Sequence, residues 1–206
     1  MSRLYRVGLT GNIAAGKSSV ANAWRALGAA VVDADVLARE AVAPGSPGLA
    51  RVVEAFGPDV LDRDGALDRA ALRRVVFADP AARRTLEAIT HPEIARLRDE
   101  ADARLERAGE RIVVHDIPLL FEVGLEDAFD LLVLVDAPEA VRRERIVRER
   151  ALPEAEAQAM IAAQMPAEAK RARADIVIDN AGTPAGLQRE AEQVWRRILD
   201  RAAASG

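Results

Sequence analysis

The stretch that decides the fold of this chain of 206 residues is Gly11-Asn12-Ile13-Ala14-Ala15-Gly16-Lys17-Ser18. It fits the pattern G-x-x-x-x-G-K-[ST], in which backbone N–H groups of a loop cradle phosphate oxygens. An apolar, strand-like run precedes the loop, and a helical pattern from Ser19 to Leu27 follows it. The order of strand, loop and helix favours a phosphate site over a simple tight turn, because the helix N-terminus adds its positive dipole end.

Composition is that of a globular protein, with 50% hydrophobic and 30% charged residues. The length predicts one domain, or one domain with a sizeable insertion. Only 3% of the residues are aromatic, so aliphatic side chains must build the core. A net charge of -4 argues against a general nucleic-acid binder, and the absence of cysteine excludes disulfides, thiolate metal sites and a cysteine nucleophile.

Location and assembly are predicted from what the chain lacks. No apolar run approaches the roughly 18 residues of a membrane span. Met1-Ser2-Arg3 leads directly into the first strand, which predicts no signal peptide. We therefore expect a cytoplasmic protein that binds neither membrane nor nucleic acid, as a monomer or a weak homo-oligomer.

Five short apolar runs predict the strands of a sheet. They are rich in Val, Ile and Leu and do not alternate, which is typical of strands buried on both faces of a parallel sheet. The runs are Tyr5–Leu9, Ala29–Val32, Arg111–Val114, Leu131–Val135 and Ile176–Ile178. Helical segments between them predict an α/β, doubly wound fold with a parallel sheet of about five strands and helices on both faces.

Two long helical stretches interrupt this alternation. Residues 36–108 contain no convincing strand and exceed the dozen or so residues of a crossover, so we interpret them as an inserted helical subdomain. The insertion either only covers the sheet or, as we favour, holds a second substrate at the strand ends. We interpret residues 137–172 as an arginine-rich helical lid and refer to this segment as the lid. The nucleotide-binding core then comprises residues 1–35, 109–136 and 173–206.

Several polar residues follow the predicted strands and could carry chemistry. Lys17 would contact phosphates, and Ser18 would bind Mg²⁺. Thr10 could reach a phosphate oxygen or satisfy the turn backbone. Asp116, at the end of an apolar run, is a second candidate for Mg²⁺. The neighbouring His115 has no nucleophile or base nearby and is expected to pack in the core.

Asp33-Ala34-Asp35 closes the second predicted strand. Asp35 could accept the proton of a hydroxyl that receives the phosphoryl group, whereas either aspartate could instead cap the next helix. We expect one aspartate to act as the base and the other to cap the helix. Their spacing on a strand directs both side chains to one face, so it does not decide between them.

The arginine cluster of residues 142–150 has two interpretations. Pairs four residues apart, such as Glu144/Arg148 and Arg145/Glu149, are typical of a solvated helix with surface ion pairs. A lid that closes over a triphosphate would instead bring an arginine to the transferring phosphoryl group and exclude water. We favour the lid for Arg145 and the ion pairs for most of the others.

Taken together, these motifs resemble the dephospho-CoA kinase family nearly from end to end. The blocks that carry the resemblance are Gly8–Gly11, Gly16–Ser18, Asp33–Asp35, Pro44-Gly45, Phe56-Gly57, Asp64-Gly65, Leu67–Arg69, Val76-Phe77, His91-Pro92, Ile117–Glu122, Ala163–Met165, Lys170 and Ile178–Gly182. The phosphate loop alone indicates only a superfamily, whereas Asp-Ala-Asp, His-Pro, Pro-Leu-Leu-Phe-Glu and Asp-Asn-x-Gly in this order are far more specific.

The resemblance implies ATP-dependent phosphorylation of the ribose 3′-hydroxyl of dephospho-CoA, the last step of coenzyme A synthesis. The motifs and the resemblance together assign catalysis to Lys17, Asp35 and Arg145, metal binding to Ser18 and Asp116, and substrate binding to Thr10, Asp33 and His91. The ATP site would be made by Gly11, Asn12, Ile13, Ala14, Ala15, Gly16, Lys17, Ser18, Ser19, Asn180 and Gly182.

The chain departs from the family pattern in its loop and its lid. Asn12, Ala14 and Ala15 stand where glycine or serine is usual, so the loop is expected to use backbone conformations open to alanine. Glu149 replaces a frequent second lid arginine, and Arg148 or Arg150 could substitute for it. Another frequent arginine is also missing before Ala162-Ala163-Gln164.

Two other functions remain as alternatives. Another phosphate-loop metabolite kinase would share the loop, although the long insertion and the Pro-Leu-Leu-Phe-Glu block argue against it. A nucleotide-dependent regulatory ATPase or switch is less favoured, because the last strand ends in Asp179-Asn180-Ala181-Gly182 and lacks the Asn-Lys-x-Asp motif of guanine recognition.

Overall fold

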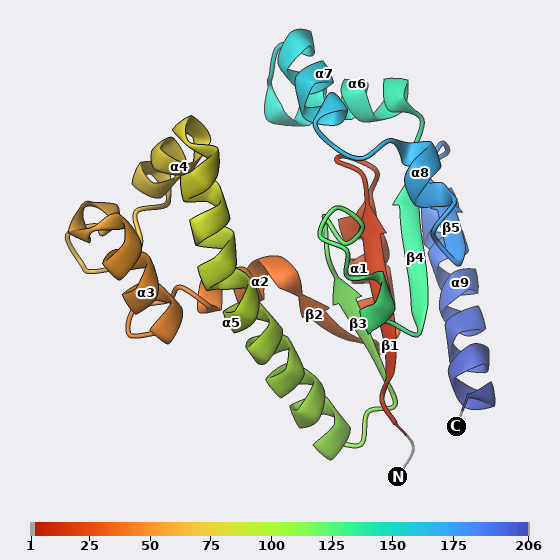
Figure 1. Cartoon of the computed structure of the whole chain (residues 1–206). Coiled ribbons are helices and arrows are strands. Elements are labelled where there is room, and N and C mark those ends of the chain that lie inside the picture. The colour runs from red at the N-terminus through yellow and green to blue at the C-terminus, as the bar shows by residue number, and fades with distance from the viewer. Residues whose placement is uncertain (1–2, 206) are drawn as a thin grey trace. The chain divides into compact units, whose positions relative to one another are not determined.

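The computed structural model describes residues 3–205 (Figure 1). In chain order, its elements are β1 (Tyr5–Gly11), α1 (Lys17–Ala26), β2 (Ala30–Asp33), α2 (Ala34–Glu40), α3 (Pro47–Phe56), η1 (Pro58–Val60), α4 (Arg69–Ala78), α5 (Pro80–Arg107), β3 (Ile112–Asp116), η2 (Glu126–Ala128), β4 (Leu131–Asp136), α6 (Glu139–Arg150), α7 (Glu154–Ala162), α8 (Ala167–Arg171), β5 (Ile176–Asp179) and α9 (Pro184–Ala204).

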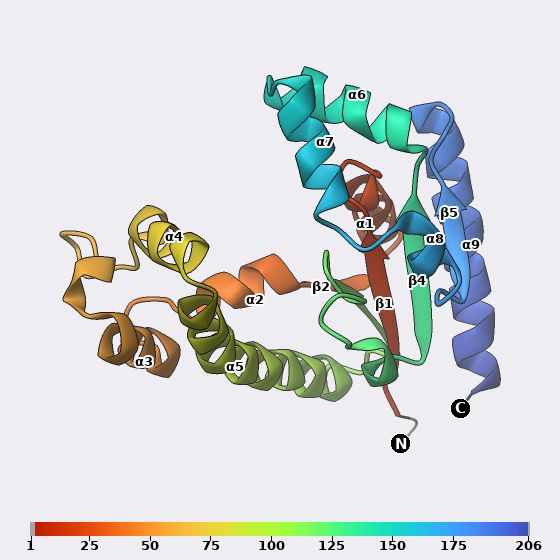
Figure 2. The same ribbon diagram turned by 45° about the horizontal axis from the view of Figure 1, so that its top comes forward.

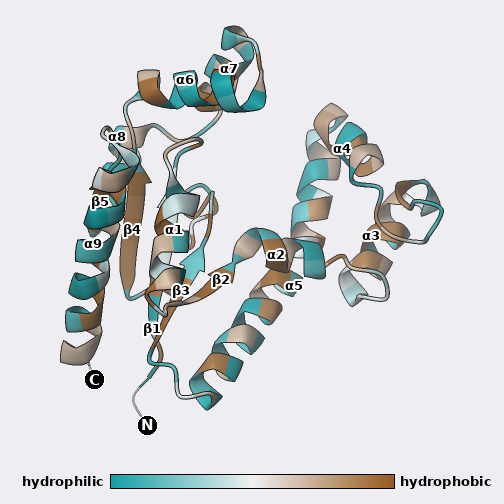
Figure 3. Cartoon of the chain, turned by 180° about the vertical axis from the view of Figure 1, so that it is seen from behind, coloured by the Kyte–Doolittle hydropathy of each residue, from teal (hydrophilic) through white to brown (hydrophobic). Residues whose placement is uncertain are grey.

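The strands form one sheet in the order β2-β3-β1-β4-β5. β1 pairs in parallel with β3 and β4, and β4 pairs in parallel with β5. All six residues of β4 are buried, and the strand is almost uniformly hydrophobic in Figure 3. The α/β fold with a five-stranded parallel sheet is therefore confirmed, and each predicted strand lies within a residue or two of its expected bounds.

The chain divides into two compact units. One comprises residues 1–32 and 105–206 and contains most of the sheet, and the other comprises residues 33–104 and is helical. In the helical unit, Ser46 caps α3 and Asp68 caps α4 through their side-chain oxygens. Its small core is formed by Val42, Val52, Val60 and Leu72.

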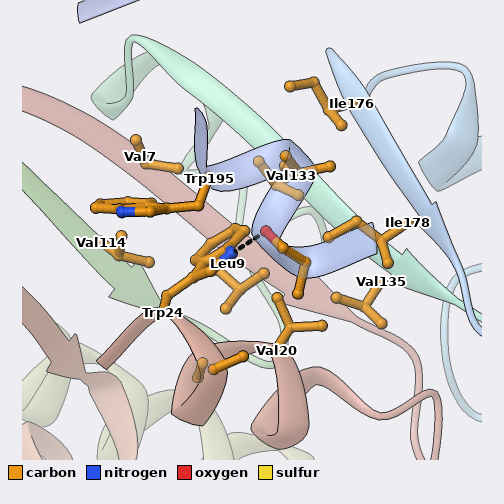
Figure 4. Close-up of a cluster of buried hydrophobic side chains, with 14 of the residues drawn as sticks. Val7, Leu9, Val20, Trp24, Val114, Val133, Val135, Ile176, Ile178 and Trp195 are labelled. Atoms are coloured by element: carbon orange, nitrogen blue, oxygen red, sulfur yellow. Dashed lines mark hydrogen bonds between the residues drawn. The ribbon is translucent and has the colours of Figure 1, made fainter. Parts of the chain in front are cut away.

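The core of the sheet-containing unit lies where α1 and α9 pack against β1, β4 and β5 (Figure 4). The ring centroids of Trp24 and Trp195 lie 5.7 Å apart, and the Trp24 indole donates a 2.8 Å hydrogen bond to the carbonyl of Ala191. Trp195 is thus a core residue. His115 is also buried and lies against the ring of Phe129.

Gly8 allows close packing on β1. A Cβ at this position would lie 2.7 Å from a methyl of Leu120 and 3.0 Å from atoms of Leu132 and Phe129. Leu120 is completely buried, so its side chain has little room to move. The glycine therefore lets the loop after β3 lie directly against the strand that carries the phosphate loop.

The expectation that Asp33 and Asp35 share a strand face is wrong. β2 ends at Asp33, and α2 begins at Ala34. The Asp33 carboxylate accepts a 2.8 Å hydrogen bond from the backbone N–H of Asp35 and thereby caps the helix. Asp35 lies exposed in the first helical turn. Asp33 takes the capping role, because its backbone is extended whereas that of Asp35 is helical.

Candidate functional site

The phosphate loop connects the end of β1 to the start of α1. Gly16 caps α1 with a φ of 98°, and its carbonyl accepts hydrogen bonds from Ser19 and Val20. The N–H of Ala15 donates to the carbonyl of Asn12. Among residues 3–205, no acceptor is recorded for the backbone N–H groups of Ala14, Gly16, Lys17 and Ser18. These donors gather at a helix N-terminus, which is the arrangement that binds an anion.

The loop's two alanines behave differently. Ala15 avoids positive φ, as expected for alanine, whereas Ala14 has a φ of 57°. The expectation that the loop spares its alanines the left-handed region is therefore wrong at Ala14. An L-residue in this region is destabilised by about 1 kcal/mol, so other contacts must hold the loop in this shape.

Lys17, in the segment that follows β1, forms an ion pair with Asp116 of the neighbouring strand β3. The two residues come from the start of α1 and the end of β3, and β1 pairs with β3 in a register that brings these ends together. Both side chains are largely buried, with 16% and 7% of their surfaces exposed. The ammonium group predicted to contact phosphate thus lies beside the carboxylate predicted to bind metal.

Asn180 connects the end of β5 to the loop. Its side-chain amide donates a 2.8 Å hydrogen bond to the carbonyl of Ala15, and its N–H donates to the carbonyl of Asp136 at the end of β4. A Cβ on Gly16 would collide with this amide. The second glycine of the loop is therefore required both by its positive φ and by the packing of Asn180.

Arg145, on α6, reaches back to the loop. Its guanidinium donates to the carbonyl of Ala14 at 3.0 Å and to the carbonyl of Asn180 at 3.2 Å. The predicted ion pair with Glu149 is not formed. Arg145 is thus placed at the phosphate loop, 131 residues away from Ala14 in the sequence.

A cavity of about 690 Å³ opens between the loop, α6 and the start of α9. Of the residues predicted for the ATP site, seven line it: Ala14, Gly16, Lys17, Ser18, Ser19, Asn180 and Gly182. Arg145, which was predicted to act in catalysis, lines it as well. Gly11, Asn12, Ile13 and Ala15 lie outside the lining, and three of these four are buried. Val141, Pro184 and Leu187 also line the cavity, and the sequence patterns gave no signal for them.

Arg148 and Arg150 both line this cavity but differ in their contacts. Arg148 pairs with Glu144 at 3.5 Å and with Glu149 at 3.1 Å. For Arg150, no ion pair or hydrogen bond with a described side chain is recorded. The surface pair Glu144/Arg148 is thus confirmed, and Arg150 is the flanking arginine without a carboxylate partner in the described part of the chain.

Three residues predicted to bind the second substrate are not among those that line this cavity. The hydroxyl of Thr10 is buried and donates to the carbonyl of Pro118 at 3.3 Å, in the loop after β3. Asp33 caps α2, and His91 is exposed on α5 next to Pro92. Both belong to the helical unit, so their part in the site stays a prediction.

A buried ion pair holds the base of the lid, and the residue patterns gave no functional role to either partner. The side chain of Lys170 is completely buried, and its Nζ lies 2.7 Å from Oε1 of Glu122, without the alignment of a hydrogen bond. The same oxygen accepts a hydrogen bond from the N–H of Met165. The only signal in the sequence was that both residues fall in blocks of the family resemblance.

Arg171 joins the ends of β4 and β5. It pairs with Asp136 at 3.0 Å and with Asp179 at 2.6 Å. The hydrogen bonds from Arg171 hold the pKa of Asp179 below its ordinary value, and those to both aspartates raise the pKa of Arg171. This charge network fixes the strand end that leads into Asn180.

Comparison of this chain with known proteins shows the sequence family to which it belongs. The profile of the family described as dephospho-CoA kinase matches residues 5–185. The chain belongs to this family. A dephospho-CoA kinase of Anaeromyxobacter dehalogenans is 54% identical over 188 residues, which cover 91% of this chain and 89% of that protein. Most of both sequences thus align.

Two further relatives agree with this assignment. A dephospho-CoA kinase of Mycolicibacterium paratuberculosis is 50% identical over 95% of this chain, which spans only 48% of that longer protein. The solved structure of a dephospho-CoA kinase from Campylobacter jejuni is 27% identical, with a TM-score of 0.73, and the match covers 94% of this chain and 96% of that one.

Within residues 3–205, no helix has the length and apolar character needed to cross a membrane.

Proposed function

We propose that this protein transfers the γ-phosphoryl group of ATP to the ribose 3′-hydroxyl of dephospho-CoA, which gives coenzyme A and ADP. The observation that carries the proposal is the set of loop N–H groups without an acceptor among residues 3–205, which lie beside Lys17 and Arg145 in a member of the dephospho-CoA kinase family. A triphosphate placed on the loop would meet donors at a helix N-terminus and two cationic side chains.

Lys17 stabilises the phosphates by charge. Its ammonium contacts Asp116, and a phosphate oxygen of bound ATP would replace this carboxylate as its partner. Because charge on the γ-phosphoryl oxygens increases during transfer, a fixed ammonium stabilises the transition state more than the bound substrate.

Mg²⁺ fits the oxygen donors around the loop. Ser18 lies exposed at the cavity, and Asp116 would offer a carboxylate once Lys17 turns to the nucleotide. The described residues contain no group of three or more His, Asp or Glu that could hold a metal ion by themselves. This suits Mg²⁺, which commonly takes one or two protein oxygens together with substrate phosphates and water. When bound, the ion would neutralise phosphate charge.

Asp35 is our candidate for the base that accepts the hydroxyl proton. Its carboxylate is exposed, and its own helix is capped by Asp33, so Asp35 stays available for a substrate. In the reaction, the 3′-oxygen forms a bond to the γ-phosphorus while the bond from this phosphorus to the ADP oxygen breaks. The proton of the hydroxyl passes to the Asp35 carboxylate.

Arg145 would exchange its two backbone carbonyl partners for phosphate oxygens. Neutral carbonyls are weaker partners for a guanidinium than a phosphate, so this exchange is favourable. Arg150, which has no carboxylate partner among the described residues, is our candidate for the position taken in the family by a second lid arginine.

One coupled assay separates this function from its alternatives. ADP production is measured with ATP and Mg²⁺ in the presence of dephospho-CoA, of other small alcohols, or of no acceptor. Turnover that depends on dephospho-CoA supports the proposal. Turnover with another alcohol alone would indicate a different metabolite kinase, and turnover that needs no acceptor would indicate a regulatory ATPase.

A further inference from the structure

The lid and the phosphate loop are joined at Ile13 and Ala14. The N–H of Ile13 donates a 2.8 Å hydrogen bond to Oε1 of Gln164, and the carbonyl of Ala14 accepts a hydrogen bond from Arg145. The side chains of both loop residues pack against a buried cluster of the lid. This cluster consists of Ile146, Ala157 and Ile161. Figure 2 shows α6 and α7 beside the loop that follows β1.

Gln164 belongs to a fixed segment between α7 and α8. Its N–H donates to the carbonyl of Ile161 at 3.2 Å. The N–H of the next residue, Met165, donates to the Glu122 carboxylate at 3.2 Å, and the buried ammonium of Lys170 lies against the same oxygen. Hydrogen bonds thus fix the backbone at Gln164 and at Met165, and the side-chain amide of Gln164 extends from this fixed segment to the loop.

The contact occurs where the loop needs support. Ala14 occupies the left-handed region, which an L-residue disfavours. Gln164 accepts a hydrogen bond from the N–H of Ile13, the residue before Ala14, and Arg145 donates one to the carbonyl of Ala14 itself. One hydrogen bond restrains the Asn12–Ile13 peptide unit and the other restrains the Ala14–Ala15 unit, so the two bonds enclose the segment that contains the strained residue.

We propose that Gln164 is a positioning residue for the nucleotide site. By accepting the hydrogen bond from Ile13, it fixes the loop conformation that leaves the N–H groups of Ala14, Gly16, Lys17 and Ser18 for phosphate oxygens. This inference deepens the proposed function and rests on it. Gln164 itself contacts the loop backbone and transfers no proton or phosphoryl group.

The first test is the variant Gln164→Met, which keeps a side chain of similar length without the acceptor oxygen. The dissociation constant of ADP, measured by calorimetry, should rise roughly 3- to 10-fold, as expected for the loss of one hydrogen bond. KM for ATP should rise in parallel, whereas KM for dephospho-CoA should stay unchanged. An ADP affinity equal to that of the wild type would overturn the proposal.

The matched control is Gln158→Met. Gln158 is an exposed glutamine of α7, and its amide contacts only Glu139 and Arg143 among the described side chains. The same substitution on the same lid should leave ADP binding unchanged. An equal loss of affinity in both variants would assign the effect to the lid in general and would contradict a specific role for Gln164.

The second test uses Gln164→Glu, which stays informative if the methionine variant folds poorly. In acid, the introduced side chain is a neutral carboxyl that keeps the acceptor oxygen of the amide, whereas at neutral pH it is a carboxylate that repels the phosphates. The ratio of the variant's ADP dissociation constant to that of the wild type should therefore fall between about pH 7 and about pH 4.5. An ADP dissociation constant that stays raised roughly 3- to 10-fold at about pH 4.5, although the neutral carboxyl can accept the hydrogen bond from Ile13, would contradict the proposal.

Measurements on the wild type show whether the proposed function or only the positioning role of Gln164 is wrong. If wild-type protein neither binds ADP nor phosphorylates dephospho-CoA, the proposed function is wrong. If the wild type does both and Gln164→Met behaves like it, only the positioning role is wrong.

Discussion

The buried ion pair between Glu122 and Lys170 offers the sharpest test of how the lid is anchored. The Lys170 side chain has no exposed surface, whereas 20% of the Glu122 side chain is exposed. Glu122→Gln preserves the shape of the side chain but removes the charge that faces the enclosed ammonium. We therefore expect this variant to destabilise the protein more than Lys170→Met does.

The expected magnitudes follow from what each variant leaves behind. Removing one partner of a buried ion pair costs about 3–5 kcal/mol, because the remaining charge stays buried without compensation. Glu122→Gln should reach this range. Lys170→Met leaves a carboxylate that is partly solvated and still accepts the Met165 N–H, so we expect about 2 kcal/mol. The double variant contains no buried charge and should be more stable than Glu122→Gln alone.

The assay is urea unfolding at neutral pH, followed by circular dichroism, of the wild type, both single variants and the double variant. Glu126→Gln is the control, because Glu126 pairs with the half-exposed Arg173 at the same lid base and should lose less than about 1 kcal/mol. The reasoning is refuted if Glu122→Gln loses no more free energy of unfolding than this control, or if the two single losses simply add.

Three further predictions concern the loop and its supports. Lys17→Ala should lower kcat by roughly 100-fold or more in a protein that still folds, since it removes charge stabilisation at the phosphoryl group; full turnover of the folded variant, with folding checked by circular dichroism, would defeat the site assignment. Gly8→Ala should reduce the free energy of unfolding by about 1–3 kcal/mol, because its methyl group would press on the buried Leu120; urea unfolding measures this, and an unchanged midpoint would contradict the packing argument. The lowered pKa of Asp179 means that its carboxylate stabilises the folded state above the ordinary aspartate pKa of about 3.9, and that this contribution is lost as the pH falls toward the lower folded-state pKa. Because 60% of its side chain is exposed, Asp179→Asn should lower the melting temperature only slightly near pH 7, and it should leave the melting temperature unchanged in strong acid. An equal loss at both pH values would exclude the pair with Arg171 as its cause.

Local patterns predicted those parts of the structure that depend on nearest neighbours in the sequence. Uninterrupted Val, Ile and Leu runs marked the strands, because a parallel sheet buries both faces of its strands. The glycine loop before a helical pattern predicted a phosphate site, and the two aspartates at the end of β2 predicted a helix cap. Which aspartate caps was left open, because both can accept a backbone N–H and only the end of the strand at Asp33 decides it.

The sequence by itself thus determined the fold class and the family of this protein, and it predicted the phosphate loop. Only the tertiary structure decided which distant groups surround the loop. Lys17 meets Asp116 across 99 residues, Ile13 meets Gln164 across 151, and Ala15 meets Asn180 across 165. Such contacts depend on sheet order and on the packing of the lid, to which many side chains contribute, and a short motif carries no information about them. The left-handed Ala14 has the same origin, because its strain is held by partners from the lid.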